Sequence, residues 1–184
     1  MVPTPTIVTR RLELRAISLD DAPAIQRLFP HWEIVKYLNH RVAWPYPTDG
    51  ALTFLRDVAL PAVARGQKWI WAIRIKGGPP HLVGAINLAI GPGESRGFWL
   101  GLDWHNQGYM TEACAPVTDF WFDVLDMPSL RVIKAIGNTG SRRVSEKQGM
   151  RLVGIEEREF VAGRLPAEIW ELTREAWSAA RPSL

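Results

Sequence analysis

The stretch Leu100-Gly-Leu-Asp-Trp-His-Asn-Gln-Gly-Tyr-Met-Thr-Glu-Ala113 decides the fold, because it predicts a strand, a polar turn and the start of a helix in direct succession. Residues 97–102 are apolar and favour a strand. From Tyr109 the apolar residues change to helical spacing, and the helix is predicted to continue to Leu125. The turn between them, residues 105–108, carries no acidic side chain.

This turn has the chemistry of an anion site. The start of a helix leaves backbone N–H groups unpaired at the positive end of the helix dipole. Gly108 would let a ligand approach the main chain closely. Together these features predict a site for a phosphate or pyrophosphate. The alternative is an ordinary connection between a strand and a helix that binds nothing, because only some helix starts bind anions.

A second stretch, Asn138-Thr-Gly-Ser-Arg-Arg-Val-Ser-Glu-Lys-Gln-Gly-Met150, follows an alternating run at residues 130–136. Together the two stretches resemble the GNAT acetyltransferase superfamily, in particular its RimJ/RimL-like branch of ribosomal-protein N-terminal acetyltransferases. That branch has a turn of the form Gln/Arg-x-x-Gly-x-Gly/Ala, often followed by Thr-Glu-Ala. Here Gly108 and Thr111-Glu-Ala113 match this pattern, whereas His105 and Met110 depart from it.

The second motif of the branch is Asn-x-x-Ser followed by Glu-Lys-x-Gly-Phe. Its matching residues here are Asn138, Ser141, Glu146, Lys147 and Gly149, with Met150 in place of the aromatic residue. The run Thr9-Arg-Arg-Leu-x-Leu-Arg15, followed by Asp20-Asp-Ala22, extends the resemblance towards the N-terminus.

The resemblance implies an α+β fold of the GNAT type. Such a fold has a mixed, mostly antiparallel twisted sheet of six to seven strands, with helices on both faces and a V-shaped splay between the fourth and fifth strands. Alternation along the chain agrees, because it predicts strands at residues 11–17, 69–75, 81–89, 96–102, 130–136, 152–161 and 167–173. Since no repeat or linker interrupts the pattern, residues 1–184 are predicted to form one domain, with a short exposed tail from Ala176.

The composition excludes several other classes of protein. The chain is 47% hydrophobic and 22% charged, as in soluble globular proteins, and has no apolar run of membrane-spanning length. The N-terminus lacks the pattern of a secretory signal, so a cytoplasmic location is expected. Cys114 is the only cysteine and the histidines lack ligand spacing, so no metal is expected. The net charge of +3 comes without a basic, aromatic stripe, so neither nucleic acid nor membrane is an expected partner.

The resemblance implies acetyl-CoA as the acyl donor and assigns residues to its parts. The pantetheine arm would pair with the strand edge at Leu100 and Leu102, with Asn138 at the mouth of the splay. Arg142, Arg143 and Lys147 are candidates for the 3′-phosphate, although each also fits a solvated helix face. The pyrophosphate would bind the turn, at Asn106, Gln107, Gly108, Tyr109, Met110 and Thr111.

The reaction implied is direct attack of an amine on the thioester. Many GNAT enzymes have a Tyr acid where this chain has Ser145. The RimJ/RimL-like branch instead resembles this chain in having a Ser at the start of the helix, so the resemblance makes Ser141 the expected proton donor to the CoA thiolate. The alternative for Ser141 is a first-turn serine that only satisfies backbone groups. Glu94 is the expected general base and Asp103 a weaker candidate. His105 has a suitable pKa but lies in the phosphate turn, and Glu112 is expected to be structural.

The acceptor is less well defined. Trp44-Pro-Tyr-Pro47 forms a rigid aromatic loop, and in the family the loop between the first helices helps to form the acceptor site. Trp44 and Tyr46 are therefore expected to line that site, unless the loop only covers the core. The acceptor would be a protein N-terminal α-amine or a small-molecule amine, bound by a monomer or homodimer. The motif departures leave a second hypothesis open, a non-catalytic sensor or structural module that binds acyl-CoA.

Overall fold

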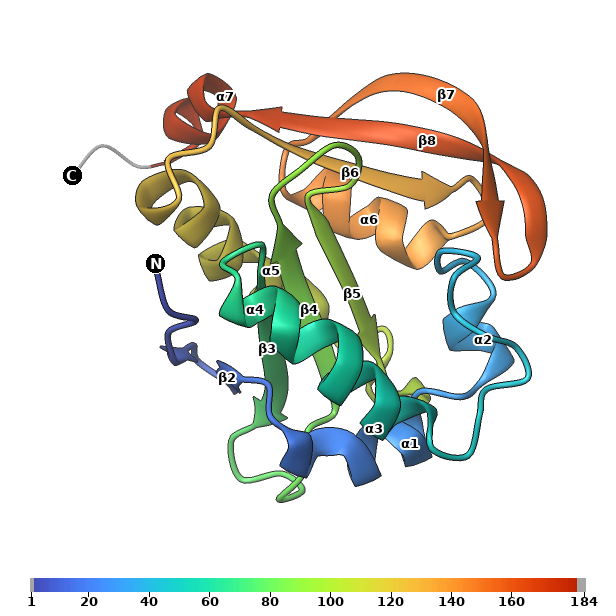
Figure 1. Ribbon diagram of the computed structural model, residues 1–184. Helices are drawn as coiled ribbons and strands as arrows, with labels where there is room; N and C mark the ends of the chain where they lie inside the picture. The colour runs from blue at the N-terminus through green and yellow to red at the C-terminus, as the bar shows by residue number, and fades with distance from the viewer. Residues whose placement is uncertain (1, 182–184) are drawn as a thin grey trace.

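A computed structural model describes residues 2–181 and contains two hydrogen-bonded sheets that diverge from each other (Figure 1). The first has the strand order β1-β2-β3-β4-β5 and the second the order β6-β8-β7, and all neighbours within each sheet are antiparallel. The strands are β1 (Ile7–Val8), β2 (Leu12–Ala16), β3 (Lys68–Ile75), β4 (Gly84–Ala89), β5 (Arg96–Leu100), β6 (Ser129–Ala135), β7 (Arg151–Phe160) and β8 (Gly163–Thr173).

The two sheets meet at a single point between β5 and β6. The backbone N–H of Ser95 donates to the carbonyl of Arg131 at 2.7 Å, and the N–H of Arg131 donates to Ser95 Oγ at 3.3 Å. Beyond this point the strands separate and belong to different sheets (Figure 1). The predicted α+β class and the splay are therefore confirmed. Residues 2–181 form eight strands, because the two-residue β1 precedes the seven that were predicted.

The separated edge of β5 is formed by Phe98 and Leu100. The N–H of Gly101 donates to the carbonyl of Val83 at 2.8 Å, which fixes the alternation of hydrogen bonding along the β4–β5 pair. By this alternation Gly97 and Trp99 pair with β4, so the backbone groups of Phe98 and Leu100 face the gap.

Helices cover both faces of the first sheet. The α-helices of residues 2–181 are α1 (Ala22–Leu28), α2 (Trp32–Val35), α3 (Gly50–Phe54), α4 (Leu60–Ala64), α5 (Tyr109–Asp119), α6 (Thr139–Lys147) and α7 (Arg174–Ala179), of which α7 packs on β8 of the second sheet. Strand β3 shows why both faces are covered, because successive side chains point to opposite sides. Trp69, Trp71 and Ile73 join the core under α5, whereas Ile70 and Ala72 join the core under α1 and α3.

The long helix after the turn continues past Pro116, as predicted. It widens into a π-helical turn at Phe120–Val124, where the N–H of Leu125 donates to the carbonyl of Phe120 at 3.1 Å. Pro116 lacks a backbone N–H and therefore interrupts the regular hydrogen bonding of the helix. Because the helix continues beyond it, the proline interrupts the helix without ending it. No helix in the part of the chain that the structure describes is long and apolar enough to cross a membrane.

The prediction of an exposed tail from Ala176 was wrong for Trp177. This residue is buried in α7, stacks on Phe122 with ring centroids 4.8 Å apart, and donates its indole N–H to Asp119 at 3.0 Å. A single apolar residue in a polar segment produces no periodic pattern, which is why the sequence did not indicate this packing.

Candidate active site

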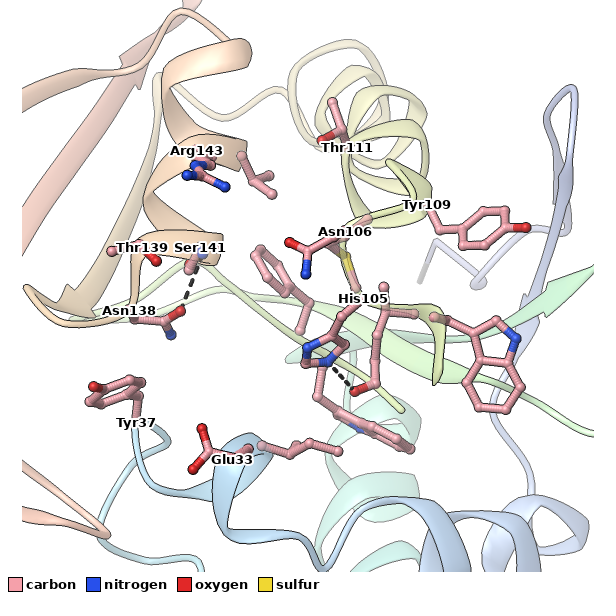
Figure 2. Close-up of a pocket in the computed structure, with 18 of the residues that line it drawn as sticks. Glu33, Tyr37, His105, Asn106, Tyr109, Thr111, Asn138, Thr139, Ser141 and Arg143 are labelled. Atoms are coloured by element: carbon pink, nitrogen blue, oxygen red, sulfur yellow. Dashed lines mark hydrogen bonds between the residues drawn. The ribbon is translucent and has the colours of Figure 1, made fainter. Parts of the chain in front are cut away.

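A cavity of about 590 Å³ opens where the starts of α5 and α6 face each other across the splay (Figure 2). Figure 2 shows Asn138, Ser141 and Arg143 on one side, with Asn106 and Thr111 on the other. Ten of the residues predicted for the site line this cavity. They are Leu100, Asn106, Gly108, Tyr109, Met110, Thr111, Asn138, Ser141, Arg143 and Lys147.

The start of α5 is open to a ligand. Gly108 precedes the helix with a φ of +78°, in the left-handed region that favours glycine. The N–H of Glu112 is the first to bond within the helix, to the carbonyl of Gly108 at 3.0 Å. The N–H groups of Tyr109, Met110 and Thr111 therefore precede the first intrahelical bond, as a phosphate site requires.

Glu112, the acidic residue of this first turn, points away from the helix start. Its carboxylate accepts hydrogen bonds from Thr9 Oγ1 at 2.6 Å, from the N–H of Arg11 at 2.8 Å and from Arg11 Nε at 2.6 Å. Although burial opposes it, these bonds from Thr9 and Arg11 lower the pKa of Glu112 to about 2. Arg11 also donates to the carbonyl of Gln107 at 3.0 Å, so one arginine connects the first long strand to the turn.

The side chains of the turn leave its main chain accessible. Met110 is buried in the main core, so its departure from the family pattern does not obstruct the cavity. The side chain of Tyr109 points away from the centre of the cavity, beneath the guanidinium of Arg11 at 4.4 Å (Figure 2). His105 is held by its ring, whose Nε2 lies 2.9 Å from the carbonyl oxygen of Leu100.

The predicted pairing edge is shifted by two residues. Strand β5 ends at Leu100, and Leu102 lies in a short 3₁₀ helix, Leu102–Trp104, where its carbonyl accepts the N–H of His105 at 3.1 Å. The turn begins at Gly101. The indole of Trp104 packs so closely on this residue that a Cβ there would lie 2.7 Å from the ring. Phe98, which also lines the cavity, takes the place that the sequence assigned to Leu102.

On the opposite wall, Asn138 precedes α6 and its Oδ1 accepts the N–H of Ser141 at 3.2 Å (Figure 2). Arg143 and Lys147 line the cavity, one turn apart. Arg142 points elsewhere, because its guanidinium pairs with Glu146 at 3.0 Å and with Glu168 at 3.1 Å. Of the three cations considered for the 3′-phosphate, Arg143 and Lys147 are thus the two that reach the cavity.

A second cavity, of about 390 Å³, adjoins the first on the far side of the splay. The residues that line both cavities are Tyr37, Leu38, Phe98, Asn138 and Ser141. Ser141 therefore lies at the junction, and the second cavity extends from it to Glu94, Arg96 and Lys134. The two predicted catalytic residues, Ser141 and Glu94, line the same space.

Glu94 lies at the separated edge of β6, where its carboxylate accepts the backbone N–H of Ile133. Burial of its carboxyl group raises the pKa of Glu94 to about 7, against the opposing effects of Lys134, of that N–H and of Arg96. The residue as a whole remains exposed to solvent at the edge of the cavity. Asp103, the weaker candidate for the base, lines neither cavity within residues 2–181.

The sequence reasoning missed the contribution of α2 and its following turn. Tyr37 lines both cavities, and a Cβ on Gly137 would meet its hydroxyl at 2.5 Å, so these two segments are in close contact. Glu33 and Lys36 line the first cavity and form an ion pair at 2.6 Å. A single turn of helix far from both motifs gives no sequence signal of this role.

Trp44 and Tyr46 are not among the residues that line these two cavities in the described part of the chain. Tyr46 packs edge-on against Phe29 with ring centroids 5.2 Å apart, and burial raises the pKa of its hydroxyl. Trp44 packs against Trp32 at 5.6 Å and is 42% exposed. Tyr46 thus packs on the core, and its expected role at the acceptor site stays a prediction.

Comparison with known proteins gives the family. The model of the acetyltransferase (GNAT) domain matches residues 11–151, which include both motifs. The chain belongs to this family. It is therefore an acetyltransferase, and the fold and the enzyme class predicted from the sequence are confirmed. A search of curated proteins returns no match.

Solved structures share the fold at low identity. One is RimL, a ribosomal L7/L12 alpha-N-protein acetyltransferase in complex with coenzyme A, with 20% identity, a TM-score of 0.75, and 92% of this chain and 98% of that chain covered. Another is a ribosomal-protein-S5-alanine acetyltransferase from Vibrio fischeri, with 14% identity, a TM-score of 0.78, and coverage of 97% and 100%. RimJ of Mycobacterium smegmatis with a CoA disulfide gives 18% identity, a TM-score of 0.75, and coverage of 89% and 82%.

Proposed function

We propose that the protein is an acetyl-CoA-dependent N-acetyltransferase that transfers the acetyl group directly to a primary amine, either a protein N-terminal α-amine or a small-molecule amine. The observation that carries the proposal is the continuity of the two cavities through Ser141. One cavity has an open helix start and a separated strand edge, as the cofactor requires, and the other has a carboxylate with a raised pKa. No metal takes part in this scheme. Within residues 2–181, no group of three or more His, Cys, Asp or Glu side chains is arranged to hold one.

Each part of the cofactor has a partner in the first cavity. The pyrophosphate accepts hydrogen bonds from the N–H groups at the start of α5, with Thr111 as a further donor. The pantetheine amides pair with the edge groups of Phe98 and Leu100, as an added strand would. Arg143 and Lys147 receive the 3′-phosphate. Asn106 and Asn138 complete the polar wall, whereas Gln107, also predicted for the site, does not line the cavity within residues 2–181 and donates its side-chain amide to the carbonyl of Asp103 at 2.7 Å.

The reaction follows from the position of the junction. The amine nitrogen attacks the thioester carbonyl carbon, so that a C–N bond forms and the C–S bond breaks. Glu94 accepts the proton that the amine loses, directly or through one water. Ser141 Oγ passes a proton to the departing thiolate and takes up one from the protonated Glu94 through water in the shared cavity, so that both residues return to their starting state. An α-amine titrates near pH ~8 and a carboxylate with a pKa of about 7 is well matched to accept its proton.

The printed names of the solved relatives support one class of acceptor. RimL is named for ribosomal L7/L12 and the Vibrio fischeri protein for ribosomal protein S5. A ribosomal-protein N-terminus is therefore a reasonable acceptor for this chain, and the cytoplasm the corresponding location. The role proposed from the sequence for Trp44 and Tyr46 would require the loop that carries them to contact a bound acceptor outside the two cavities.

The test is thiol release from acetyl-CoA over a panel of amines and N-terminal peptides. Amine-dependent release supports the enzyme, whereas tight binding of CoA without turnover by any amine supports the sensor. Ser141→Ala should lower kcat by about 10²-fold or more, in the range of acid–base catalysis, with little change in the Kd for CoA. Ser178→Ala, at an exposed site on α7, is the matched control.

A further inference from the structure

Two buried cations stand out in the second cavity. Arg96 is 1% exposed and Lys134 is 3% exposed, and both line the cavity beyond Ser141. A buried charge is costly unless it is paired and hydrogen-bonded. Yet within residues 2–181 neither forms an ion pair with a carboxylate, although eleven other ion pairs are present.

The hydrogen bonds of Arg96 leave part of its charge unsatisfied. One terminal nitrogen donates to Thr118 Oγ1 at 2.9 Å, and the other lies 3.8 Å from the sulfur of Met150, a weak acceptor. Its Nε is buried without any partner. Thr118 itself donates to the carbonyl of Cys114 at 2.8 Å, so its hydroxyl hydrogen is already used.

Lys134 is likewise bound only by neutral groups. Its Nζ donates to the carbonyl of Ser141 at 3.1 Å and to the hydroxyl of Ser145. Burial and the neighbouring charge of Arg96 lower the pKa of Lys134 to about 8, despite the opposing effect of Glu94. The nearby buried carboxylate, Glu168, is already engaged by the indole of Trp170 at 2.8 Å and by Arg142.

The position of Arg96 and Lys134 along the cofactor path indicates which substrate groups could reach them. Arg96 precedes Phe98 by two residues on β5, so the two side chains lie on the same face of the strand. An arm that pairs with Leu100 and Phe98 brings its acyl end towards Arg96. The acceptor must approach the same point from the second cavity, so both substrates can present a group to Arg96 and Lys134.

We propose that the second cavity contains an anion subsite, in which Arg96 and Lys134 receive a carboxylate carried by one of the two substrates. The carboxylate is either the far end of a dicarboxylic acyl group on the donor or a carboxylate near the amine of the acceptor. This inference rests on the proposed function, because it assumes that the two cavities hold the donor and the acceptor. The bond changes at the thioester are the same for either source.

Two matched pairs of substrates distinguish the sources. Succinyl-CoA and butyryl-CoA carry acyl chains of the same length with and without a terminal carboxylate. Tyrosine and tyramine are amines of the same body with and without a carboxylate. The wild-type protein should prefer the charged member of one pair by at least about tenfold in kcat/KM, because a hydrogen bond to a charged group discriminates by that order.

The variants assign the preference to the two cations. Arg96→Gln should reduce it to less than about threefold, and Arg96→Lys should retain part of it. Arg131→Gln removes a positive charge from an exposed site at the closed end of the splay and should leave it unchanged. Burial makes Arg96 variants prone to misfolding. Two tests do not depend on those variants: the preference of the wild-type protein within each substrate pair, and its reduction in Lys134→Met.

Equilibrium binding separates this inference from the proposed function. If no amine supports thiol release, the proposed function fails, and the Kd values of succinyl-CoA and butyryl-CoA, with those of tyrosine and tyramine, still test the subsite. If transfer occurs but the wild type distinguishes neither pair, or if folded Arg96→Gln keeps the full preference, the subsite is refuted while the acetyltransferase assignment stands.

Discussion

Hydrogen bonds from Thr9 and Arg11 to Glu112 connect the segment before β2 to the start of α5. The variant Glu112→Gln tests how much these bonds stabilise the fold. The carboxylate of Glu112 is 18% exposed and accepts three hydrogen bonds from Thr9 and Arg11. These bonds lower its pKa from 4.5 to about 2. A difference of about 2.5 pKa units corresponds to about 3 kcal/mol of stability at pH 7. The amide of Gln retains one acceptor but turns its NH₂ towards donors, so most of this stabilisation should be lost.

The pH dependence has a defined sign. A carboxylate whose pKa is lowered on folding contributes its full stabilisation above the unfolded value, near pH 4.5, and loses it as the pH falls towards 2. The contribution of about 3 kcal/mol at pH 7 should therefore fall to roughly half of that at pH 3. Wild type and Glu112→Gln should accordingly differ most at neutral pH and approach each other in acid.

The assay is urea unfolding of both proteins at pH 7, 5, 4 and 3, followed by tryptophan fluorescence. Thermal unfolding at pH 7 should show a decrease in Tm of roughly 6–12 °C. Glu146→Gln, which removes a half-exposed pair with Arg142 on α6, is the control and should cost less than about 1 kcal/mol. A loss below 1 kcal/mol for Glu112→Gln, or a loss that does not shrink between pH 5 and pH 3, would refute the argument.

Three further changes test other parts of the site and fold. Gly108→Ala, at a φ of +78°, should cost about 1–2 kcal/mol of stability and weaken CoA binding several-fold in a titration, whereas Gly163→Ala, at +104° in the β7–β8 turn, should destabilise without changing the Kd for CoA. Glu94→Gln should remove the acid limb near pH 7 from the pH profile of kcat at saturating amine, because a base must be unprotonated to act; Glu159→Gln, which lines the same cavity, should retain that limb. Trp177→Ala should lower the free energy of unfolding by about 3–5 kcal/mol, the usual cost of truncating a buried aromatic residue, and an unchanged Tm would show that α7 does not stabilise the domain.

The elements with strong local patterns were predictable from the sequence. The alternation at residues 69–75 and 130–136 predicted β3 and β6, and the change to helical spacing at Tyr109 predicted α5. A glycine was predicted directly before the start of this helix, and Gly108 is found there with a positive φ; its role in binding a phosphate stays a prediction. These features are encoded within a few consecutive residues, so no knowledge of tertiary packing is needed to find them.

The parts that were missed depend on contacts between distant segments. Strand β5 ends at Leu100, where the indole of Trp104 packs on the following Gly101. Trp177 is buried because it stacks on Phe122 and donates a hydrogen bond to Asp119. Tyr37 reaches the junction of the two cavities only through the close approach of α2 to Gly137. None of these contacts leaves a periodic or compositional signal in the chain.

The charges of the second cavity show how such contacts create chemistry. Lys134 and Arg96 occupy strand positions at which alternation predicts a buried side chain, and an apolar residue would satisfy the fold there. Replacing buried charges by apolar groups is often neutral or stabilising, so stability alone does not explain two buried cations that form no close ion pair and share only the longer-range charge of Glu94. Their shared opening onto the path between Ser141 and Glu94 supplies a reason, because a carboxylate bound there would offset their desolvation in the complex. The same two buried charges would then both destabilise the free protein and make the enzyme selective for a substrate that carries a carboxylate.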